Sequence, residues 1–251
     1  MTTEGKLIVI EGPDHVGRSM HARLLSERLK AHGVAVTIVG LARSTLLGDL
    51  IKGSNAALHQ LNWRTRALLY ATDLHDQYIH QIEPLMAAGF VVIAGRYTMT
   101  PLIRESIRGG DEEWIRGLYS SMPQPDITVV LQAGGRRLLN RMMYNDSLTK
   151  LNHYEAGADL ALSPSITRSF LGYQKLLKRA FMEKAEQGGY PMIHTRATVL
   201  EVHGAIWDHV KPSVADMLQA IKKCGPQAGP STEESRRGCG VTMTWVPSKA
   251  R

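Results

Sequence analysis

The chain has 251 residues, 43% of them hydrophobic and 21% charged, which is enough to bury one substantial core and favours a single domain with a tail. Its 30 basic and 23 acidic residues give a formal net charge of +7, which suits an anionic partner such as a nucleotide; the charge is spread along the chain, so nucleic-acid binding is not specifically indicated. No stretch approaches the ~18 continuous apolar residues of a membrane span, and Cys224 and Cys239 form no metal-ligand cluster, so we expect a soluble protein of the reducing cytoplasm.

The first predicted elements are a strand, a loop and a helix. Residues 6–11 (KLIVIE) are a short β-branched run, and residues 19–32 carry leucines on one helical face after a Gly-Pro-Asp turn. Gly33 fits the end of that helix, and residues 34–39 (VAVTIV) predict the second strand. The chain therefore opens as a βαβ unit.

Strands and helices continue to alternate after this unit. Residues 63–86 have helical spacing, residues 90–94 (FVVIA) and 127–131 (ITVVL) are apolar strands, and a weaker last strand is expected around Ile193. Continuous apolar strands that alternate with helices predict an α/β fold, namely a doubly wound parallel sheet with helices on both faces.

The end of the chain differs in composition. From Cys224 onward Gly, Pro, Ser, Thr and charged residues dominate, so we place the domain at residues 1–215 and predict a disordered tail at residues 216–251. An alternative for residues 241–246 (VTMTWV) is an added edge strand or a partner-binding segment.

A phosphate-binding loop is predicted between the first strand and the first helix. The pattern requires Gly, four residues, Gly, Lys, and Ser or Thr, because backbone N–H groups and the helix N-terminus surround phosphate oxygens. Gly12, Gly17 and Ser19 match it, whereas Arg18 replaces the Lys and keeps the charge on a larger planar group. The ATP-binding loop is expected to consist of Gly12, Pro13, Asp14, His15, Val16, Gly17, Arg18 and Ser19.

Two side chains of this loop have further expected roles. The hydroxyl of Ser19 would bind Mg²⁺, as the corresponding Ser or Thr does in the phosphate-loop pattern. His15 would replace a glycine with a side chain that points outwards.

The opening of the chain resembles the thymidylate kinase family. Residues 10–19 (IEGPDHVGRS) follow that family's Glu-Gly-x-Asp-Gly-x-Gly-Lys-Ser opening, and three further blocks match in order: residues 68–73 (LLYATD), 84–97 (PLMAAGFVVIAGRY) and 125–131 (PDITVVL). The similarity covers roughly residues 6–210. It implies a P-loop NTP hydrolase fold, ATP as phosphoryl donor, Mg²⁺ as cofactor, a nucleoside monophosphate as acceptor, and a homodimer.

The resemblance also implies roles for single residues. Asp14 would approach the acceptor sugar, Arg96 and Arg43 would hold the acceptor phosphate, and Tyr70 would stack on the base. Because phosphoryl transfer depends on alignment and charge neutralisation, Arg18 and Arg96 are the expected catalytic pair, with Asp14 as the third catalytic residue. The remaining acceptor-binding positions are Asp73, Thr100, Arg104 and Glu105.

The sequence departs from the family pattern at several positions that the resemblance assigns to the functional site. Gly95 stands where the family has an Asp expected near Mg²⁺, and Glu105 replaces an amide, which removes the donor half of that group and alters recognition of a pyrimidine edge. Ser44, Leu74 and Gln132 replace a Glu, an Arg and an Asp of the family.

Residues 141–168 lie where the family has its lid, and they have little hydrophobic periodicity. Arg141, Lys150 and Arg168 are candidates to close over ATP, and Arg141 is taken as the ATP-binding residue. The alternative is a solvated connection between two helices.

Two hypotheses of function follow. The first is a kinase that transfers the γ-phosphoryl group of Mg-ATP to dTMP or a related nucleotide, supported by Asp14, Ser19 and Arg96. The second is a nucleotide-binding or regulatory protein that kept the fold and lost the chemistry, which the changes at Arg18 and Gly95 favour.

Overall fold

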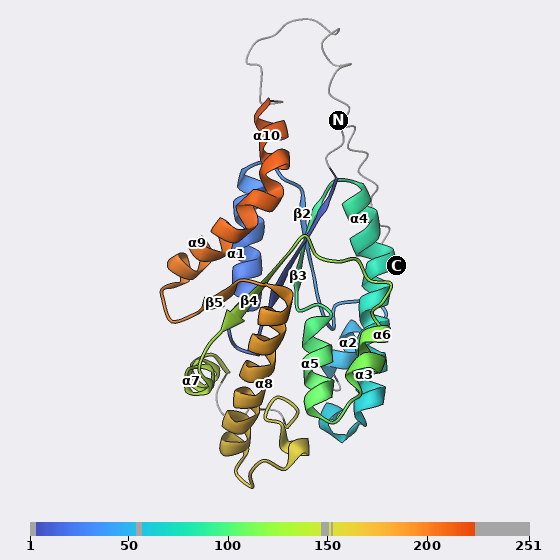
Figure 1. The fold of residues 1–251 in the computed structure, drawn as a ribbon, viewed down its shortest axis with the longest axis vertical. Coiled ribbons are helices and arrows are strands. Elements are labelled where there is room, and N and C mark those ends of the chain that lie inside the picture. The colour runs from blue at the N-terminus through green and yellow to red at the C-terminus, as the bar shows by residue number, and fades with distance from the viewer. Residues whose placement is uncertain (1–3, 54–56, 147–150, 152, 224–251) are drawn as a thin grey trace, which may run out of the picture.

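A sheet of five parallel strands, in the order β2-β3-β1-β4-β5, forms the centre of the fold (Figure 1). The computed structural model describes residues 4–53, 57–146, 151 and 153–223 of the chain. The strands are β1 (Lys6–Glu11), β2 (Val36–Val39), β3 (Val91–Gly95), β4 (Ile127–Gln132) and β5 (Met192–His194). This sheet confirms the predicted α/β class.

Successive residues of β1 alternate between two apolar layers. Ile8 and Ile10 pack with apolar side chains of α1 and α9, whereas Leu7 and Val9 pack with those of α3. Figure 1 shows α1 and α9 on one side of the sheet and α3, α4 and α5 on the other. Because both faces are covered, the strands are apolar at nearly every position, as expected for a buried parallel sheet.

The helices that cover the sheet have the following bounds. The α-helices are α1 (Arg18–Ala31), α2 (Gly48–Gly53), α3 (Trp63–Gln77), α4 (Glu83–Ala87), α5 (Met99–Ile107), α6 (Glu112–Gly117), α7 (Gly135–Asp146), α8 (Ile166–Gly188), α9 (Val199–Val210) and α10 (Ala215–Lys223). The short helical turns are η1 (Leu58–Gln60), η2 (Tyr78–Ile82), η4 (Ala158–Leu160) and η5 (Lys211–Val214).

The helix predicted over residues 63–86 is divided in the structure. A π-helical turn, η2, separates α3 from α4, and Pro84 lies in the first turn of α4. Proline has no N–H to donate, so it fits the start of a helix better than its interior. The second strand begins at Val36, two residues after the predicted start.

The prediction of a disordered tail is wrong for residues 216–223, which form most of α10. Ile221 lies one helical turn after Met217 and Leu218, and all three pack against the apolar layer that contains α1. This packing stabilises the helix. The rest of the predicted tail, residues 224–251, lies outside the described residues together with both cysteines and residues 241–246.

The order of the strands determines where a ligand can bind. The chain moves from β1 towards β2 and β3 on one side, and then returns to β4 and β5 on the other. In open parallel sheets, such a change of direction leaves a crevice at the carboxyl ends of the strands. The loops after β1 and β3 lie at this edge. None of the described helices is both long and apolar enough to cross a bilayer.

Candidate active site

The predicted phosphate loop connects β1 to α1 at the crevice. Gly12 has φ +134°, and a Cβ placed on it would lie 2.4 Å from the carbonyl oxygen of Leu131 in β4, so only glycine fits. Gly17, with φ +107°, directly precedes α1; no side chain caps the start of this helix, and its first turn contains no acid. The first N–H groups of α1 are therefore available to an anion.

Asp14 binds three arginines from two different parts of the chain. Its Oδ1 accepts hydrogen bonds from Nη2 of Arg18, at 2.9 Å, and from Nη2 of Arg96, and its Oδ2 accepts one from Nη2 of Arg104. Arg18 also donates through Nη1 to the carbonyl of Pro13, at 2.8 Å. The side chain predicted to reach the ATP phosphates is thus directed towards Asp14.

The charges of this cluster change the protonation of its members. Burial alone would raise the pKa of Asp14, but the guanidiniums of Arg104, Arg96 and Arg18 outweigh it and hold that pKa well below its usual value. Burial, followed by the charge of Arg96, lowers the pKa of Arg18 to about 9. The carboxylate is therefore ionised at neutral pH, and the cluster carries a net positive charge.

A cavity of about 180 Å³ opens beside this cluster. Its lining residues are Arg18, Ser19, Leu41, Ala42, Arg43, Ile51, Lys52, Tyr70, Gly95, Arg96, Arg104, Tyr154 and Glu155. Five of these side chains are cationic and one is acidic, so the cavity suits a small, strongly anionic ligand such as a phosphate group.

Arg43 reaches the cavity from the loop after β2, which Asp73 holds in place. The carboxylate of Asp73 is fully buried and accepts hydrogen bonds from the N–H groups of Ala42, at 2.6 Å, and Ser44, at 3.0 Å. Gln77, one turn further along α3, exchanges two hydrogen bonds with the backbone of Gly40. Asp73 therefore positions the loop, and its own side chain does not line the cavity.

Glu11 holds the start of α5, and the sequence analysis assigned it no role. Its buried carboxylate accepts hydrogen bonds from the N–H of Tyr97, at 2.8 Å, and from the hydroxyl of Thr100, at 2.5 Å. Because Arg96 lies between the end of β3 and Tyr97, these bonds fix the position of the Arg96 backbone. Thr100, predicted to bind the acceptor, is directed to Glu11 and does not line the cavity.

Glu105 forms a buried ion pair with Arg66. Its Oε2 lies 2.9 Å from Nε of Arg66, and the two side chains are 0% and 2% exposed. The hydroxyl of Tyr154 donates to the other oxygen, at 3.0 Å. Burial raises the pKa of Glu105, and the positive charges of Arg66 and Arg108 oppose that change. Glu105, predicted to face the acceptor, is thus occupied by protein partners.

Two further residues connect the phosphate loop to its surroundings. His15 was predicted to point outwards, but its side chain contacts Glu155 instead. Its Nε2 lies 3.4 Å from Oε2 of Glu155, and this contact raises the pKa of the imidazole. Arg141, on α7, donates to the carbonyl oxygens of Val16, at 3.0 Å, and Thr195, at 2.9 Å. Arg141 is therefore beside the loop, as expected of an ATP-binding residue, but it contacts protein carbonyls.

The structure thus brings together part of the predicted site. Of the predicted residues, the cavity lining contains Arg18, Ser19, Arg43, Tyr70, Arg96 and Arg104. Lys52, Tyr154 and Glu155 were missed, because they come from a short helix and from the stretch between α7 and α8, where no sequence motif marks them. Only the chain's tertiary packing places them at the cavity.

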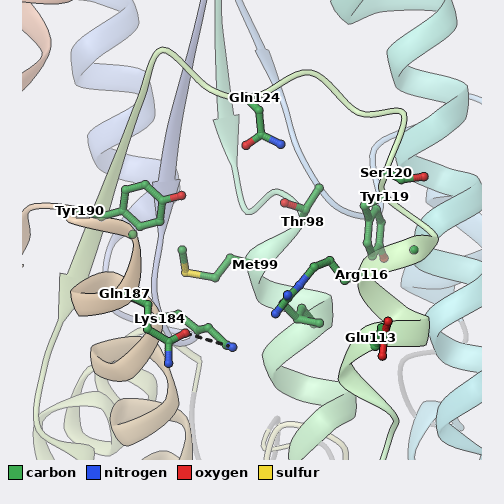
Figure 2. Close-up of a pocket in the computed structure, with 13 residues that line it drawn as sticks. Thr98, Met99, Glu113, Arg116, Tyr119, Ser120, Gln124, Lys184, Gln187 and Tyr190 are labelled. Carbon is green, nitrogen blue, oxygen red and sulfur yellow. Dashed lines mark hydrogen bonds between the residues drawn. The ribbon is translucent and has the colours of Figure 1, made fainter.

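A second, larger cavity of about 680 Å³ lies between α5, α6 and the end of α8 (Figure 2). Its lining contains none of residues 12–19 and includes Arg116 and Lys184, both of which pair with Glu112. Of these two cavities, the smaller one is lined by residues of the phosphate loop together with an excess of positively charged side chains.

The buried Arg66–Glu105 pair gives a prediction for stability. Arg66→Met should lower the free energy of unfolding by about 3–5 kcal/mol, because it leaves the Glu105 carboxylate buried without its partner. Arg64→Met, on the exposed side of the same helix, is the matched control and should change it by less than about 1 kcal/mol. Urea denaturation measures both, and equal losses in the two variants would contradict the assigned role of the pair.

Comparisons with known proteins agree with this geometry. The family model described as thymidylate kinase matches residues 10–197. A protein of Saccharolobus solfataricus named "Probable thymidylate kinase 2" is 30% identical over 183 residues, which cover 73% of this chain and 84% of that protein. A "Probable thymidylate kinase" of Pyrococcus abyssi is 26% identical and covers 82% of this chain and 96% of its own length.

A solved structure shows the same fold. The thymidylate kinase from Candida albicans superposes with a TM-score of 0.63 at 19% identity, covering 84% of this chain and 93% of that one. The match to the family model and the similarity to the Saccharolobus protein both extend over most of the sequence. The chain therefore belongs to the thymidylate kinase family.

Proposed function

We propose that this chain transfers the γ-phosphoryl group of ATP to a nucleoside monophosphate, and that dTMP is its acceptor. The observation that carries the proposal is the cluster of Arg18, Arg96 and Arg104 around Asp14, beside the N-terminus of α1. This arrangement offers one anion site at the loop and a second at the arginines, as a transfer between two phosphates requires. The names of the archaeal relatives support dTMP as the acceptor.

Each part of the site has a role in this reaction. The N–H groups of the loop bind the phosphates of the donor. Arg96 and Arg43 bind and orient the acceptor phosphate, and Arg18 neutralises charge between donor and acceptor. Since a phosphate monoester loses its second proton with a pKa near 6, the attacking oxygen is already anionic at neutral pH, and no general base is needed.

The residues present fit Mg²⁺ together with ATP. The side chain of Ser19 is exposed at the cavity, where its hydroxyl would hold the ion next to the donor phosphates. No group of three or more His, Cys, Asp or Glu residues suited to a metal occurs in the described part of the chain. The ion would neutralise charge on the donor phosphates, and Ser19 would supply its protein ligand.

The lid assignment also remains a proposal. Residues 141–168 would cover the bound donor, within one nucleotide kinase domain at residues 1–215. The contact of Arg141 with the carbonyl of Val16 supports this, because it places the start of the stretch against the phosphate loop. A cytoplasmic location, where ATP and nucleoside monophosphates are available, would be tested by cell fractionation; recovery with membranes would contradict it.

We further propose that two copies associate. Leu68 on α3 and Ile79 on the adjoining turn are apolar side chains that are 49% and 56% exposed, and a second copy would cover them. Light scattering at micromolar concentration should give twice the mass of the chain. A mass of one chain at every concentration would contradict the proposal.

The kinase proposal is tested by measuring ADP release with Mg-ATP and a panel of nucleoside monophosphates. Turnover should be highest with dTMP. Arg96→Ala should lower kcat/KM by about 100-fold, because it removes a charge-neutralising group from the acceptor phosphate. Arg179→Ala, which changes an arginine that is 81% exposed on α8, is the control and should leave kcat/KM unchanged.

Binding measurements separate the two hypotheses of function. If Mg-ATP raises the melting temperature but no acceptor is phosphorylated, the chain is a nucleotide-binding protein and the kinase proposal fails. Activity that survives Arg96→Ala would instead show that the acceptor phosphate binds elsewhere.

A further inference from the structure

The larger cavity lies against a different face of α5 from the phosphate loop (Figure 2). Arg104 on this helix binds Asp14 of the loop, whereas Met99 and Leu102, which lie on the other face of the helix, line the larger cavity. The two cavities share no lining residue. A ligand in the larger cavity would therefore leave the phosphate crevice free.

The size of the larger cavity suits a small organic molecule. Its volume of about 680 Å³ is within the ~300–1,000 Å³ usual for small-molecule sites. Three elements form it, because its lining comes from α5, from α6 and the loop that follows, and from the end of α8.

The charges around this cavity are balanced. Arg116 and Lys184 in its lining both pair with Glu112, and Glu113 adds a second carboxylate. Two cations thus face two carboxylates, whereas the phosphate cavity has five cationic side chains and one acidic side chain. An anion would gain little attraction in return for its lost hydration, so the larger cavity favours an uncharged ligand.

The lining combines apolar side chains with a few directed polar groups. Met99, Leu102 and the ring of Tyr190 form the apolar part, which suits an aromatic ring. Figure 2 shows the amide of Gln124 and the hydroxyl of Thr98 directed into the space next to Tyr190. A side-chain amide has an oxygen acceptor and two N–H donors, so an amide group on a ligand can bind it through both kinds of hydrogen bond.

The walls of the cavity are fixed by contacts within the protein. The ring of Tyr190 packs so closely on Gly188 that a Cβ at Gly188 would lie 2.3 Å from it. The hydroxyl of Tyr97 donates to the carbonyl of Pro123, at 3.1 Å, directly before Gln124. The cavity is therefore formed before any ligand binds, as is usual for small-molecule sites.

We propose that the larger cavity is a second small-molecule site, which binds an uncharged aromatic molecule that carries an amide group. The aromatic ring would lie against Tyr190 and Met99, and the amide group would bind Gln124 and Thr98. This site goes beyond the proposed kinase function and does not depend on it, because the kinase reaction uses the crevice on the other face of α5.

The test uses indole-3-acetamide, an uncharged aromatic amide, as the probe. Calorimetry should detect one binding site, with an affinity that saturating Mg-ATP and dTMP leave unchanged. Indole-3-acetate has the same ring with a carboxylate in place of the amide. It should bind about tenfold more weakly or less, because the balanced charges do not compensate for the lost hydration of the carboxylate.

Two variants test where the probe binds. Gly117→Leu adds a side chain to the lining at a position where a Cβ would meet no atom of the described residues within 4 Å, so it should weaken binding by about tenfold or more without disturbing the fold. Gln124→Leu removes the amide and should weaken binding by about tenfold. Gly204→Leu, on α9, is the matched control and should leave the affinity unchanged, because a Cβ at Gly204 also meets no described atom within 4 Å.

Several results would overturn the proposal: no binding of indole-3-acetamide at millimolar concentration, its displacement by Mg-ATP or dTMP, tighter binding of indole-3-acetate, or wild-type affinity in a folded cavity variant. Circular dichroism establishes which variants are folded. Gln124 is exposed on a loop, so Gln124→Leu decides if Gly117→Leu does not fold. Because the readout is binding outside the phosphate crevice, a failure of the kinase proposal through absent turnover leaves this test intact.

Discussion

The site depends on one buried carboxylate, that of Asp14, which binds three guanidiniums. Arg18, Arg96 and Arg104 repel one another, and their convergence is tolerable only because Asp14 lies between them. Arg18 and Asp14 belong to the phosphate loop, while the other two arginines follow β3. Asp14 therefore connects the donor side of the crevice to its acceptor side. Because one carboxylate faces three guanidiniums, the cluster keeps an excess of positive charge that attracts a phosphate group.

Further buried ion pairs extend this arrangement along α5. Arg104 and Glu105 on this helix pair with Asp14 of the phosphate loop and Arg66 of α3, and Arg108, directly after the helix, pairs with Asp159 in the stretch before α8. Burying charge is costly unless every partner is present, so these pairs fix relative positions more than they add stability. Glu105 and Arg108 also hold Tyr154 beside the cavity, and the pairs explain why three charged residues in and directly after α5 face the protein interior.

Much of the fold could be predicted from the sequence, because apolar runs such as residues 90–94 are local signals of buried strands. The phosphate loop could also be predicted, since the backbone at Gly12 and Gly17 has a positive φ that favours glycine. The directions of the polar side chains could not be predicted from the sequence. Glu105 was expected to face the acceptor, yet it pairs with Arg66, which is distant in sequence. Arg18 was expected to face the donor phosphates, yet its guanidinium binds Asp14. Only tertiary contacts such as its hydrogen bond to Glu105 bring Tyr154 to the site.

The most direct test of this account is the melting temperature of Asp14→Asn with and without inorganic phosphate. The variant leaves three arginines without a counter-charge, so it should lose about 3 kcal/mol of stability, and phosphate should restore much of that loss while raising the wild type far less. A variant that melts with the wild type, and responds to phosphate to the same extent, would contradict the central role of Asp14.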